Sequence, residues 1–400
     1  MTTPNFNPTR AAGLARLSQF VASAGRHYQN TRNADLGPDD RSNVSALSPY
    51  IRHRLVTEEE VLRAVLAKHS YAAAEKFIQE VFWRSYFKGH LVTRPIIWQN
   101  YRGALSNLKM QGGMLKAYDA ATSGHSGIEC FDAWVAELLQ TGYLHNHTRM
   151  WFASIWIFTL RLPWELGADF MIRHLLDGDP ASNTLSWRWV AGLHTKGKTY
   201  LARADNIETY TQGRFSPTGL AHDAVALEEP ALPPAQKISQ CPENYSGGKI
   251  GLLLTEEDLH SESWGVDAPQ VVAVAGASQV MASELVTQFK TGAVTDGVRR
   301  ASDKFSVSGE ILRGLEAEHI LKWAQSHQLK TIVTAYAPTG PVAEALALLK
   351  SPEIKLVQLR RAFDSAAWPH GSKGFFAMKE KIPDLLQRIV ETQNPQLSLI

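Results

Sequence analysis

Apolar residues recur at helical spacing throughout the first half of the chain. In residues 71–91, 127–144 and 148–162 they stand three or four positions apart, which is the spacing of one face of an α-helix. No segment before residue 216 alternates apolar and polar positions in the manner of a half-buried strand. The pattern therefore predicts an all-α domain over residues 1–215.

Two helix starts in this half are marked by capping residues. Ser48 precedes Pro49, and the two residue types suit the N-cap and the first helical position. Thr57 is followed three residues later by Glu60, which predicts a capping box. We expect helices to begin at both places.

The pattern changes after a stretch rich in Pro, Gly and polar residues, 216–248, which we interpret as a linker. Short β-branched runs then alternate with helical segments. The predicted strands lie within 250–259, 271–280, 330–338 and 354–359, and the predicted helices within 310–328 and 340–350. This alternation predicts a smaller, Rossmann-like α/β domain with a parallel sheet over residues 249–400. The turn "AGASQV" lacks the Gly-x-Gly-x-x-Gly fingerprint, so we infer no dinucleotide there.

Composition narrows the class of protein. No run approaches eighteen uncharged apolar residues, so we expect no membrane span, and the N-terminus does not resemble a signal peptide. Cys130 and Cys241 alone cannot ligate an iron–sulfur cluster or a four-Cys zinc site. We expect a monomer in a reducing cytoplasm.

Charge is distributed unevenly along the chain. Residues 1–215 hold 24 Lys and Arg against 18 Asp and Glu, whereas residues 216–400 hold 17 against 21. The first half is therefore the better partner for a polyanion. A chance imbalance on solvated helices is the competing interpretation.

Three stretches of the helical half resemble the flavin domain of the photolyase/cryptochrome family. They read "FIQEVFWRSYF" (77–87), "GYLHNHTRM" (142–150) and "LLDGDPASNTLSWRWVAGL" (175–193), and weaker agreement extends the resemblance to about 190 residues. The order of domains departs from the family, in which an α/β antenna domain normally precedes the flavin domain. No antenna motif is recognised in the last part of the chain, so the resemblance gives no support for an antenna chromophore.

The resemblance implies an FAD-dependent protein whose reduced flavin, excited by blue light, splits cyclobutane pyrimidine dimers in DNA. It implies that Arg149 pairs with Asp177 along the flavin and that Asn183 faces flavin N5. At position 44 the family prefers Thr, where this chain has Val44. The implied FAD-binding residues are Tyr28, Ser45, Leu47, Ser48, Phe77, Arg84, Arg149, Asp177, Asp179 and Asn183.

The implied lesion-binding residues are Glu80, Trp83, Asn146 and Met150. Glu80 and Asn146 would contact the dimer during the reaction, and Trp83 would stack on the flipped bases. His145 and His147 are two positions apart and would diverge on a helix. Photolyases for the (6-4) lesion use paired His, so we favour the cyclobutane lesion. The competing interpretation is a surface pair between Glu80 and Arg84, four positions apart.

The resemblance also implies that Trp187 and Trp164 carry electrons to the flavin. The outer Trp of the family would fall at about Ala121, and Tyr118, Trp151 or Trp156 could replace it. Core packing is the competing interpretation for each Trp, and a turn with an N-cap is the competing interpretation of the sequence "DGD". Two rival functions stay open at this stage: a cryptochrome-like photoreceptor without repair activity, and a helical protein that binds no flavin.

Overall fold

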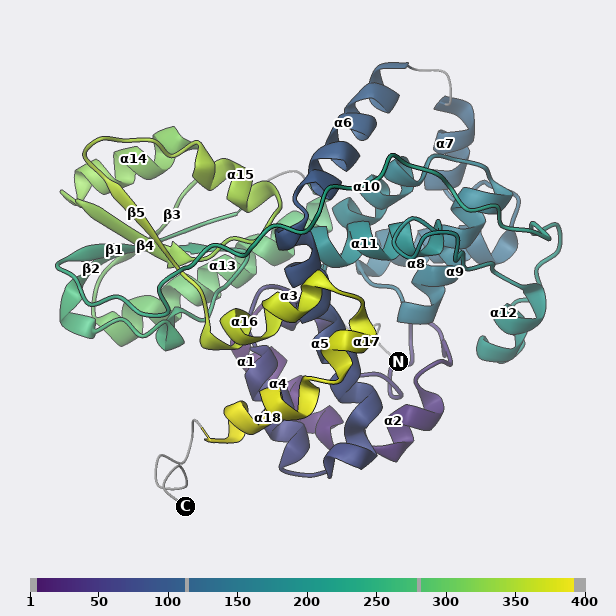
Figure 1. Ribbon diagram of the computed structural model, residues 1–400, viewed down its shortest axis with the longest axis horizontal. Coiled ribbons are helices and arrows are strands. Elements are labelled where there is room, and N and C mark those ends of the chain that lie inside the picture. The colour runs from purple at the N-terminus through teal and green to yellow at the C-terminus, as the bar shows by residue number, and fades with distance from the viewer. Residues whose placement is uncertain (1–5, 112–114, 279–281, 392–400) are drawn as a thin grey trace.

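The computed structural model describes residues 6–111, 115–278 and 282–391 of the chain. Figure 1 shows a helical half next to a twisted sheet, with the last helices lying along the helical half. The helices of the first half are α1 (Arg10–Phe20), α2 (Arg26–Thr31), α3 (Ser48–Arg52), α4 (Glu58–Leu66), α5 (Tyr71–Thr93), α6 (Ile96–Gln111), α7 (Leu115–Thr122), α8 (Glu129–Thr141), α9 (Asn146–Ser154), α10 (Trp164–His174), α11 (Pro180–Val190) and α12 (Ala204–Tyr210). The predicted helical first half is confirmed.

The two predicted helix starts differ in outcome. Thr57 and Glu60 form the expected capping box at the start of α4. At α3, however, Leu47 occupies the N-cap and Ser48 is the first helical residue. The prediction for Ser48 is therefore wrong by one position, because the chain already turns into helical geometry at Leu47.

The second half contains a parallel sheet of five strands in the order β3-β2-β1-β4-β5. The strands are β1 (Ile250–Thr255), β2 (Val271–Ala277), β3 (Gly309–Ile311), β4 (Thr331–Ala335) and β5 (Lys355–Leu359). The helices α13 (Glu284–Phe305), α14 (Ala317–Ser326) and α15 (Pro341–Ala347) complete the α/β arrangement. The predicted α/β fold with a parallel sheet is thus confirmed.

The helix expected over residues 310–328 begins later than predicted. Gly309–Ile311 instead form the edge strand β3, which pairs with Val274–Gly276 of β2, and α14 begins at Ala317. Pairing with an existing strand satisfies backbone groups that local helical spacing cannot account for.

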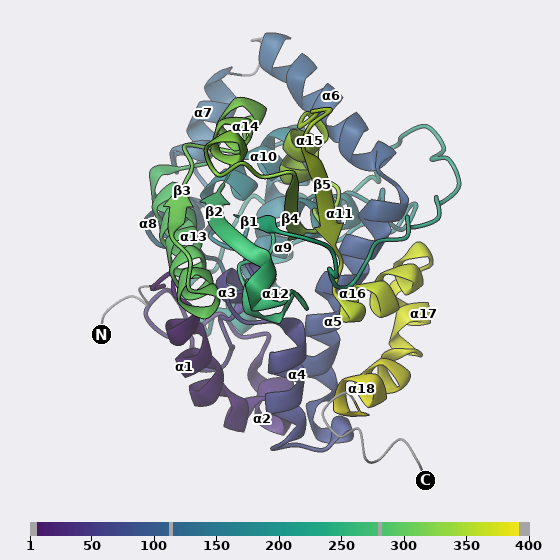
Figure 2. The same cartoon turned by 90° about the vertical axis from the view of Figure 1, so that its left-hand side faces the viewer.

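The last helices return to the helical half. They are α16 (Ala362–Ala367), α17 (Phe375–Lys379) and α18 (Ile382–Glu391), and they run beside α4 and α5 (Figure 2). The 3₁₀ segment Trp368–Ser372 approaches α5 so closely that a Cβ on Gly89 would lie 2.4 Å from the Trp368 carbonyl oxygen. One hydrophobic core accordingly continues from Val61 of α4 to Leu254 of β1 and Phe363 of α16.

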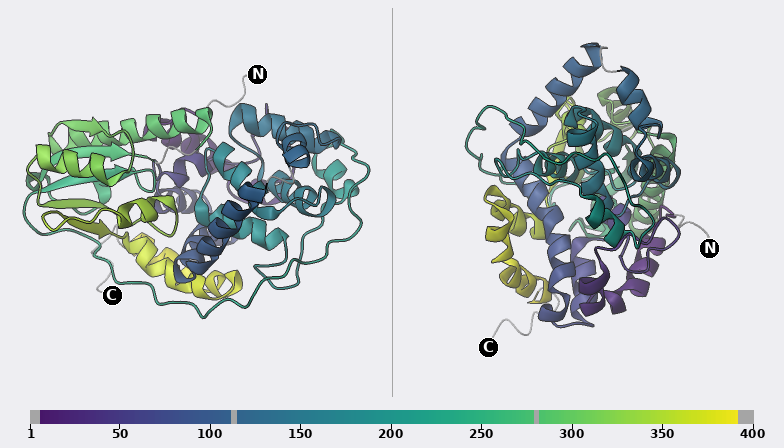
Figure 3. Two further views of the ribbon diagram at one scale, coloured as in Figure 1. Left: turned by 90° about the horizontal axis from the view of Figure 1, so that it is seen from above. Right: turned by 90° about the vertical axis from the view of Figure 1, so that its right-hand side faces the viewer.

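The predicted linker contains no regular element. After α12 the chain runs along the outside of the molecule until it enters β1, as Figure 3 shows. Within the described residues, no helix has both the length and the apolar character needed to span a membrane. The exact domain boundaries at residues 215 and 249 stay a prediction.

Candidate functional site

The turn Asp177–Gly178–Asp179 joins α10 to α11 and carries two carboxylates, two positions apart. Asp179 is the N-cap of α11, and its Oδ1 accepts hydrogen bonds from the backbone N–H groups of Ala181 and Ser182, both at 3.0 Å. A Cβ on Gly178 would lie 2.7 Å from the Ile172 carbonyl oxygen, which explains the glycine at this position. The N-cap interpretation of this sequence is therefore correct for Asp179.

The second oxygen of Asp179 binds two cations. Its Oδ2 lies 2.9 Å from Arg84 Nη1 and 2.9 Å from Lys88 Nζ. Burial alone would raise the pKa of Asp179, but Lys88, Arg84 and Arg52 hold it well below its usual value. Because both oxygens already have protein partners, Asp179 acts here as an anchor of the turn, and its direct contact with FAD stays a prediction.

The same cations connect the turn to the α/β half. Arg52 Nε donates to the Gly178 carbonyl oxygen at 2.9 Å, and Arg52 Nη2 lies 2.8 Å from Glu257 Oε1. Lys88 Nζ lies 3.1 Å from the other oxygen of Glu257. The side chains of Arg52, Lys88, Asp179 and Glu257 are at most 5% exposed. They form a buried ionic network between the two halves.

Glu257 enters this network because of its place in the sheet. It follows β1, whose neighbours are β2 and β4, at the carboxyl edge where the strand order reverses. In open α/β sheets this edge is the usual place for a ligand. Here Arg52, Arg54 and Lys88 of the helical half occupy it, through contacts with Glu257 and Asp258.

Arg149 and Asp177 form the ion pair that the sequence predicted. Arg149 Nη1 and Nη2 lie 3.1 and 2.9 Å from the two oxygens of Asp177. The guanidinium lies over the Tyr143 ring, 5.5 Å from its centroid. Although burial alone would lower the pKa of Arg149, Asp177 raises it. The Arg149 side chain nevertheless stays 24% exposed.

Glu80, on α5, forms a different ion pair. It pairs with Arg32 of α2, so the alternative pair with Arg84 does not form. Burial raises the pKa of Glu80, yet 33% of its side chain is exposed. Beside this pair, Tyr28 packs edge-on against Phe77 with ring centroids 5.2 Å apart.

Asn183 and Trp187 share a face of α11, as their spacing predicted. Asn183 Nδ2 donates to the Ala168 carbonyl oxygen at 2.9 Å, and the residue is 8% exposed. The Trp187 ring lies 6.1 Å from Trp156 and 6.4 Å from Phe152, centroid to centroid. Its Nε1–H is buried without a hydrogen-bond partner.

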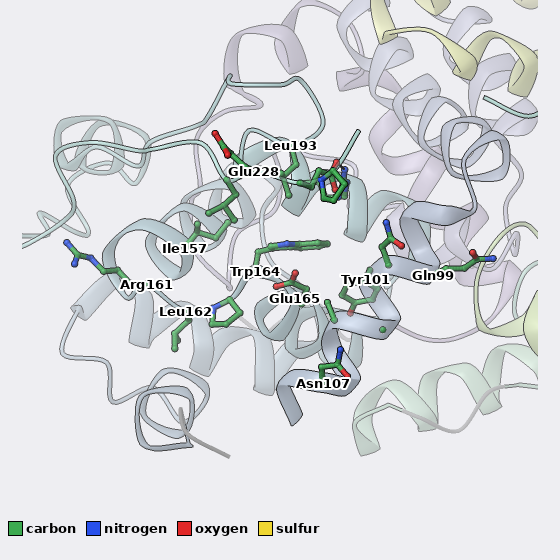
Figure 4. Close-up of a pocket in the computed structure, with 18 residues that line it drawn as sticks. Gln99, Tyr101, Asn107, Ile157, Arg161, Leu162, Trp164, Glu165, Leu193 and Glu228 are labelled. Atoms are coloured by element: carbon green, nitrogen blue, oxygen red, sulfur yellow. Dashed lines mark hydrogen bonds and ion pairs between the residues drawn. The ribbon is translucent and has the colours of Figure 1, made fainter. Parts of the chain in front are cut away.

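Trp164 lies elsewhere, against an open pocket of about 960 Å³ (Figure 4). Its ring contacts Tyr101 at 5.5 Å, and Arg188 lies over it at 6.0 Å. Among the ring contacts within the described residues, none joins Trp164 to Trp187. The position proposed for an outer Trp, Ala121, is buried.

The predicted lesion residues have different surroundings. Trp83 stacks on Phe375 of α17, with ring centroids 3.6 Å apart and ring planes 8° apart. Glu80, on the same helix, contacts α2 instead. Asn146 is exposed at the start of α9, and Met150 is half-buried on the same helix.

The predicted diphosphate residues lie around the start of α3. Ser45 Oγ accepts from the Leu47 backbone N–H at 3.3 Å, and Ser48 begins the helix. The other end of α3 reaches the turn at 177–179, because His53 Nε2 lies 3.2 Å from the Leu176 carbonyl oxygen. The role of these residues in FAD binding stays a prediction.

Sequence reasoning missed Arg52, Lys88 and Glu257. One signal was available for Glu257: an acidic residue directly after a buried strand lies at the carboxyl edge of the sheet. No local signal marks Arg52 and Lys88 as its partners, since these are more than 160 positions away in sequence.

Polar side chains thus converge around the α10–α11 turn, in a helical half that packs on an α/β unit. Residues 77–219 match the family model described as the FAD binding domain of DNA photolyase. This part of the helical half is therefore similar to the FAD binding domain of DNA photolyase.

Individual relatives match about half of the chain. The chain is 31% identical to a deoxyribodipyrimidine photo-lyase of Streptomyces griseus over 220 residues, which is 51% of this chain and 47% of that protein. It is 33% identical to the photo-lyase of Neurospora crassa over 196 residues, 47% of this chain and 31% of that protein. A class III photolyase structure from Agrobacterium tumefaciens matches with a TM-score of 0.43 at 27% identity, covering 50% of this chain and 42% of that one. The chain thus spans less than half the length of these relatives.

The residues around the turn suit an FAD. Arg149 and Glu80 are partly exposed, Asn183 is a buried amide, and Trp187 has a buried N–H without a partner. Asp177 balances the charge of Arg149. These residues would hold the cofactor, with Asp179 fixing the turn behind them.

Proposed function

We propose that the chain is a light-driven DNA repair flavoprotein, a deoxyribodipyrimidine photolyase that splits cyclobutane pyrimidine dimers. The observation that carries the proposal is the bidentate, partly exposed Arg149–Asp177 pair, within the segment that matches the photolyase FAD binding domain. When bound, the reduced flavin supplies a light-excited electron to the dimer and receives it back.

Three residues of the chain prepare the cofactor site. Asp177 fixes the Arg149 guanidinium in one orientation, so the cation is ordered before the cofactor binds. Asn183 offers neutral hydrogen-bonding groups, which adapt to a flavin atom that gains or loses a proton. Its amide is already oriented by the Ala168 carbonyl oxygen.

The lesion would enter next to Glu80, Asn146 and Met150. The Glu80 carboxylate pairs with Arg32, and its oxygens could accept a hydrogen bond from a thymine N–H. A dimer is poorly stacked in DNA, so flipping it toward these residues costs less than flipping an intact base. The excess of Lys and Arg in residues 1–215 supports contacts with DNA phosphates.

A cryptochrome-like photoreceptor is the second candidate, and one observation favours it. Phe375 covers a face of Trp83, the residue that would stack on the flipped bases. Repair therefore requires α17 to move or the dimer to use the open part of the indole, whereas a photoreceptor requires neither. Repair of a dimer-containing oligonucleotide under blue light separates the two functions: dimers disappear with a photolyase and persist with a photoreceptor.

A further inference from the structure

The buried ionic network links the turn at residues 177–179 to the sheet through shared cations. Two cations, Arg52 and Lys88, stand between the carboxylates of Asp179 and Glu257. Each cation contacts both acids, with separations of 2.8 to 3.8 Å. Asp179 belongs to the turn, and Glu257 belongs to the α/β half.

We propose that Glu257 is a positioning residue of the FAD site, which makes the α/β half part of that site. The inference rests on the proposed function only for the identity of the cofactor. Within the part of the chain that the structure describes, no side-chain hydrogen bond or ion pair joins Glu257 to the turn or to the predicted FAD-binding residues. It acts through Arg52, which donates to the Gly178 carbonyl oxygen, and through Lys88, which binds Asp179.

Charge balance explains why Glu257 is required in this arrangement. Burial alone would raise the pKa of Glu257, but Arg52 and Lys88 lower it to about 2, so the residue is ionised at neutral pH. Without its charge, Arg52 and Lys88 would compete with Arg84 for the single carboxylate of Asp179. A buried cation that loses its partner moves or binds water. Because Arg52 and Lys88 both contact the turn, the turn would shift with them.

The neighbouring residue Asp258 provides a matched control. It also follows β1, is buried, and binds two cations, Arg54 at 3.3 Å and Arg361 at 2.6 Å. Neither of these cations contacts the turn in the way that Arg52 and Lys88 do. Glu257→Gln and Asp258→Asn therefore each remove one buried interface charge, but only the first removes a partner of the cations that contact the turn.

The experiment compares FAD titrations of the full-length wild type, Glu257→Gln and Asp258→Asn, together with their melting temperatures without FAD. We expect Glu257→Gln to weaken FAD binding by about tenfold, a common size for coupling between sites, and to alter the fine structure of the bound flavin's absorbance. Asp258→Asn should lose thermal stability while it keeps the wild-type affinity and spectrum. Equal affinities and spectra for all three proteins would overturn the inference, as would equal losses in both variants.

Amide exchange without cofactor separates this inference from the proposed function. The backbone N–H groups of Ala181 and Ser182, which donate to Asp179, should exchange faster in Glu257→Gln than in Asp258→Asn. If Glu257→Gln does not fold, Glu257→Asp is the second variant, because it keeps the charge on a shorter side chain. It should give a smaller increase in the exchange rates of the two amides. A wild type that binds no FAD would refute the proposed function, while exchange would still decide the role of Glu257. Unchanged exchange at both amides would overturn that role.

Discussion

Trp83 lies face to face on Phe375, with ring planes 8° apart and centroids 3.6 Å apart. The contact joins a helix of the photolyase-like half, α5, to one of the last helices of the chain, α17. The same indole is the predicted stacking partner for the flipped lesion. Phe375 and a base of the lesion would therefore compete for one face of Trp83.

Phe375→Leu should tighten the binding of dimer-containing DNA severalfold. The substitution keeps an apolar side chain but removes an aromatic stack of about 0.5–1.5 kcal/mol, which the lesion then no longer has to displace. Phe376, which is 82% exposed, gives the control variant Phe376→Leu, with wild-type binding expected. Binding is measured as Kd for an oligonucleotide with and without one dimer. Unchanged or weaker binding by Phe375→Leu would show that Trp83 does not stack on the lesion.

Asp177→Asn should lower the FAD content of the purified protein. The substitution removes the charge that orients Arg149, and a charge-assisted pair of this kind is stronger than a neutral hydrogen bond. The measurement is the ratio of flavin absorbance to protein absorbance after saturation with FAD. Asp205→Asn breaks an exposed ion pair with Arg203 and serves as the control, with full flavin content expected. Full content in Asp177→Asn would refute the assigned role of the Arg149 pair.

Light-driven reduction of the flavin should depend on Trp187 and Trp156. The ring contacts lead from Trp187 to Trp156 at 6.1 Å and on to the half-buried Tyr118 at 6.0 Å. Trp187→Phe and Trp156→Phe should each slow reduction in the presence of an external reductant, and both should still repair DNA when the flavin is reduced chemically beforehand.

Trp164→Phe distinguishes this route from the one that the family resemblance implies. The ring of Trp164 contacts Tyr101 rather than Trp187, so we expect its substitution to have the smaller effect. If Trp164→Phe alone blocks reduction while Trp156→Phe does not, the order implied by the resemblance is correct and the route through Trp156 is wrong.

Folding stability should fall as the pH drops from 6.5 to 4.5. Burial lowers the pKa of His53 to about 3 and that of His145 to about 4, below the usual value of about 6.5. The contribution of these two histidines to the free energy of unfolding is therefore complete above pH 6.5. It is lost at lower pH, because their side chains bind protons in the unfolded chain but stay neutral in the folded chain. Each such histidine lowers the free energy of unfolding by up to about 1.4 kcal/mol for each pH unit in this window. Buried carboxylates with lowered pKa values add their losses only at lower pH.

The variant His145→Asn tests this assignment by urea unfolding at several pH values. His145 accepts a hydrogen bond from the His147 backbone N–H as the N-cap of α9, and Asn can take that place without titrating. The free energy of unfolding should depend less steeply on pH in His145→Asn than in the wild type. His125→Asn, at an exposed position, should leave the dependence unchanged. A stability that is constant between pH 6.5 and 4.5 would contradict the account.

Local sequence determined much of the helical half. The sequence "DGD" indicated a turn around Gly178, and the N-cap that stood as its competing interpretation forms at Asp179. The expected Arg149–Asp177 pair forms across 28 positions. Asn183 and Trp187 share a helix face because their spacing matches one helical turn. Such features depend on residues that are close in sequence or on a pattern shared with a family.

Contacts between the two halves could not be predicted in this way. Lys88 and Glu257 are 169 positions apart, and their pairing depends on how the sheet docks on α5. The stack of Trp83 on Phe375 depends on the same docking. The competing interpretation, a surface pair of Glu80 and Arg84, is wrong, since Arg32, Glu58 and Asp179 of the same helical half are their partners in the folded chain.

The most direct test of the proposed function is dimer repair by the full-length chain with chemically reduced FAD. An oligonucleotide that carries one cyclobutane thymine dimer is incubated with the protein under blue light and in the dark, and intact thymines are quantified by chromatography. We predict that the dimer is converted to thymines in the light, with many turnovers per protein, and that it persists in the dark. Persistence of the dimer in the light, while the flavin stays reduced and the DNA stays bound, would contradict a photolyase function for this chain.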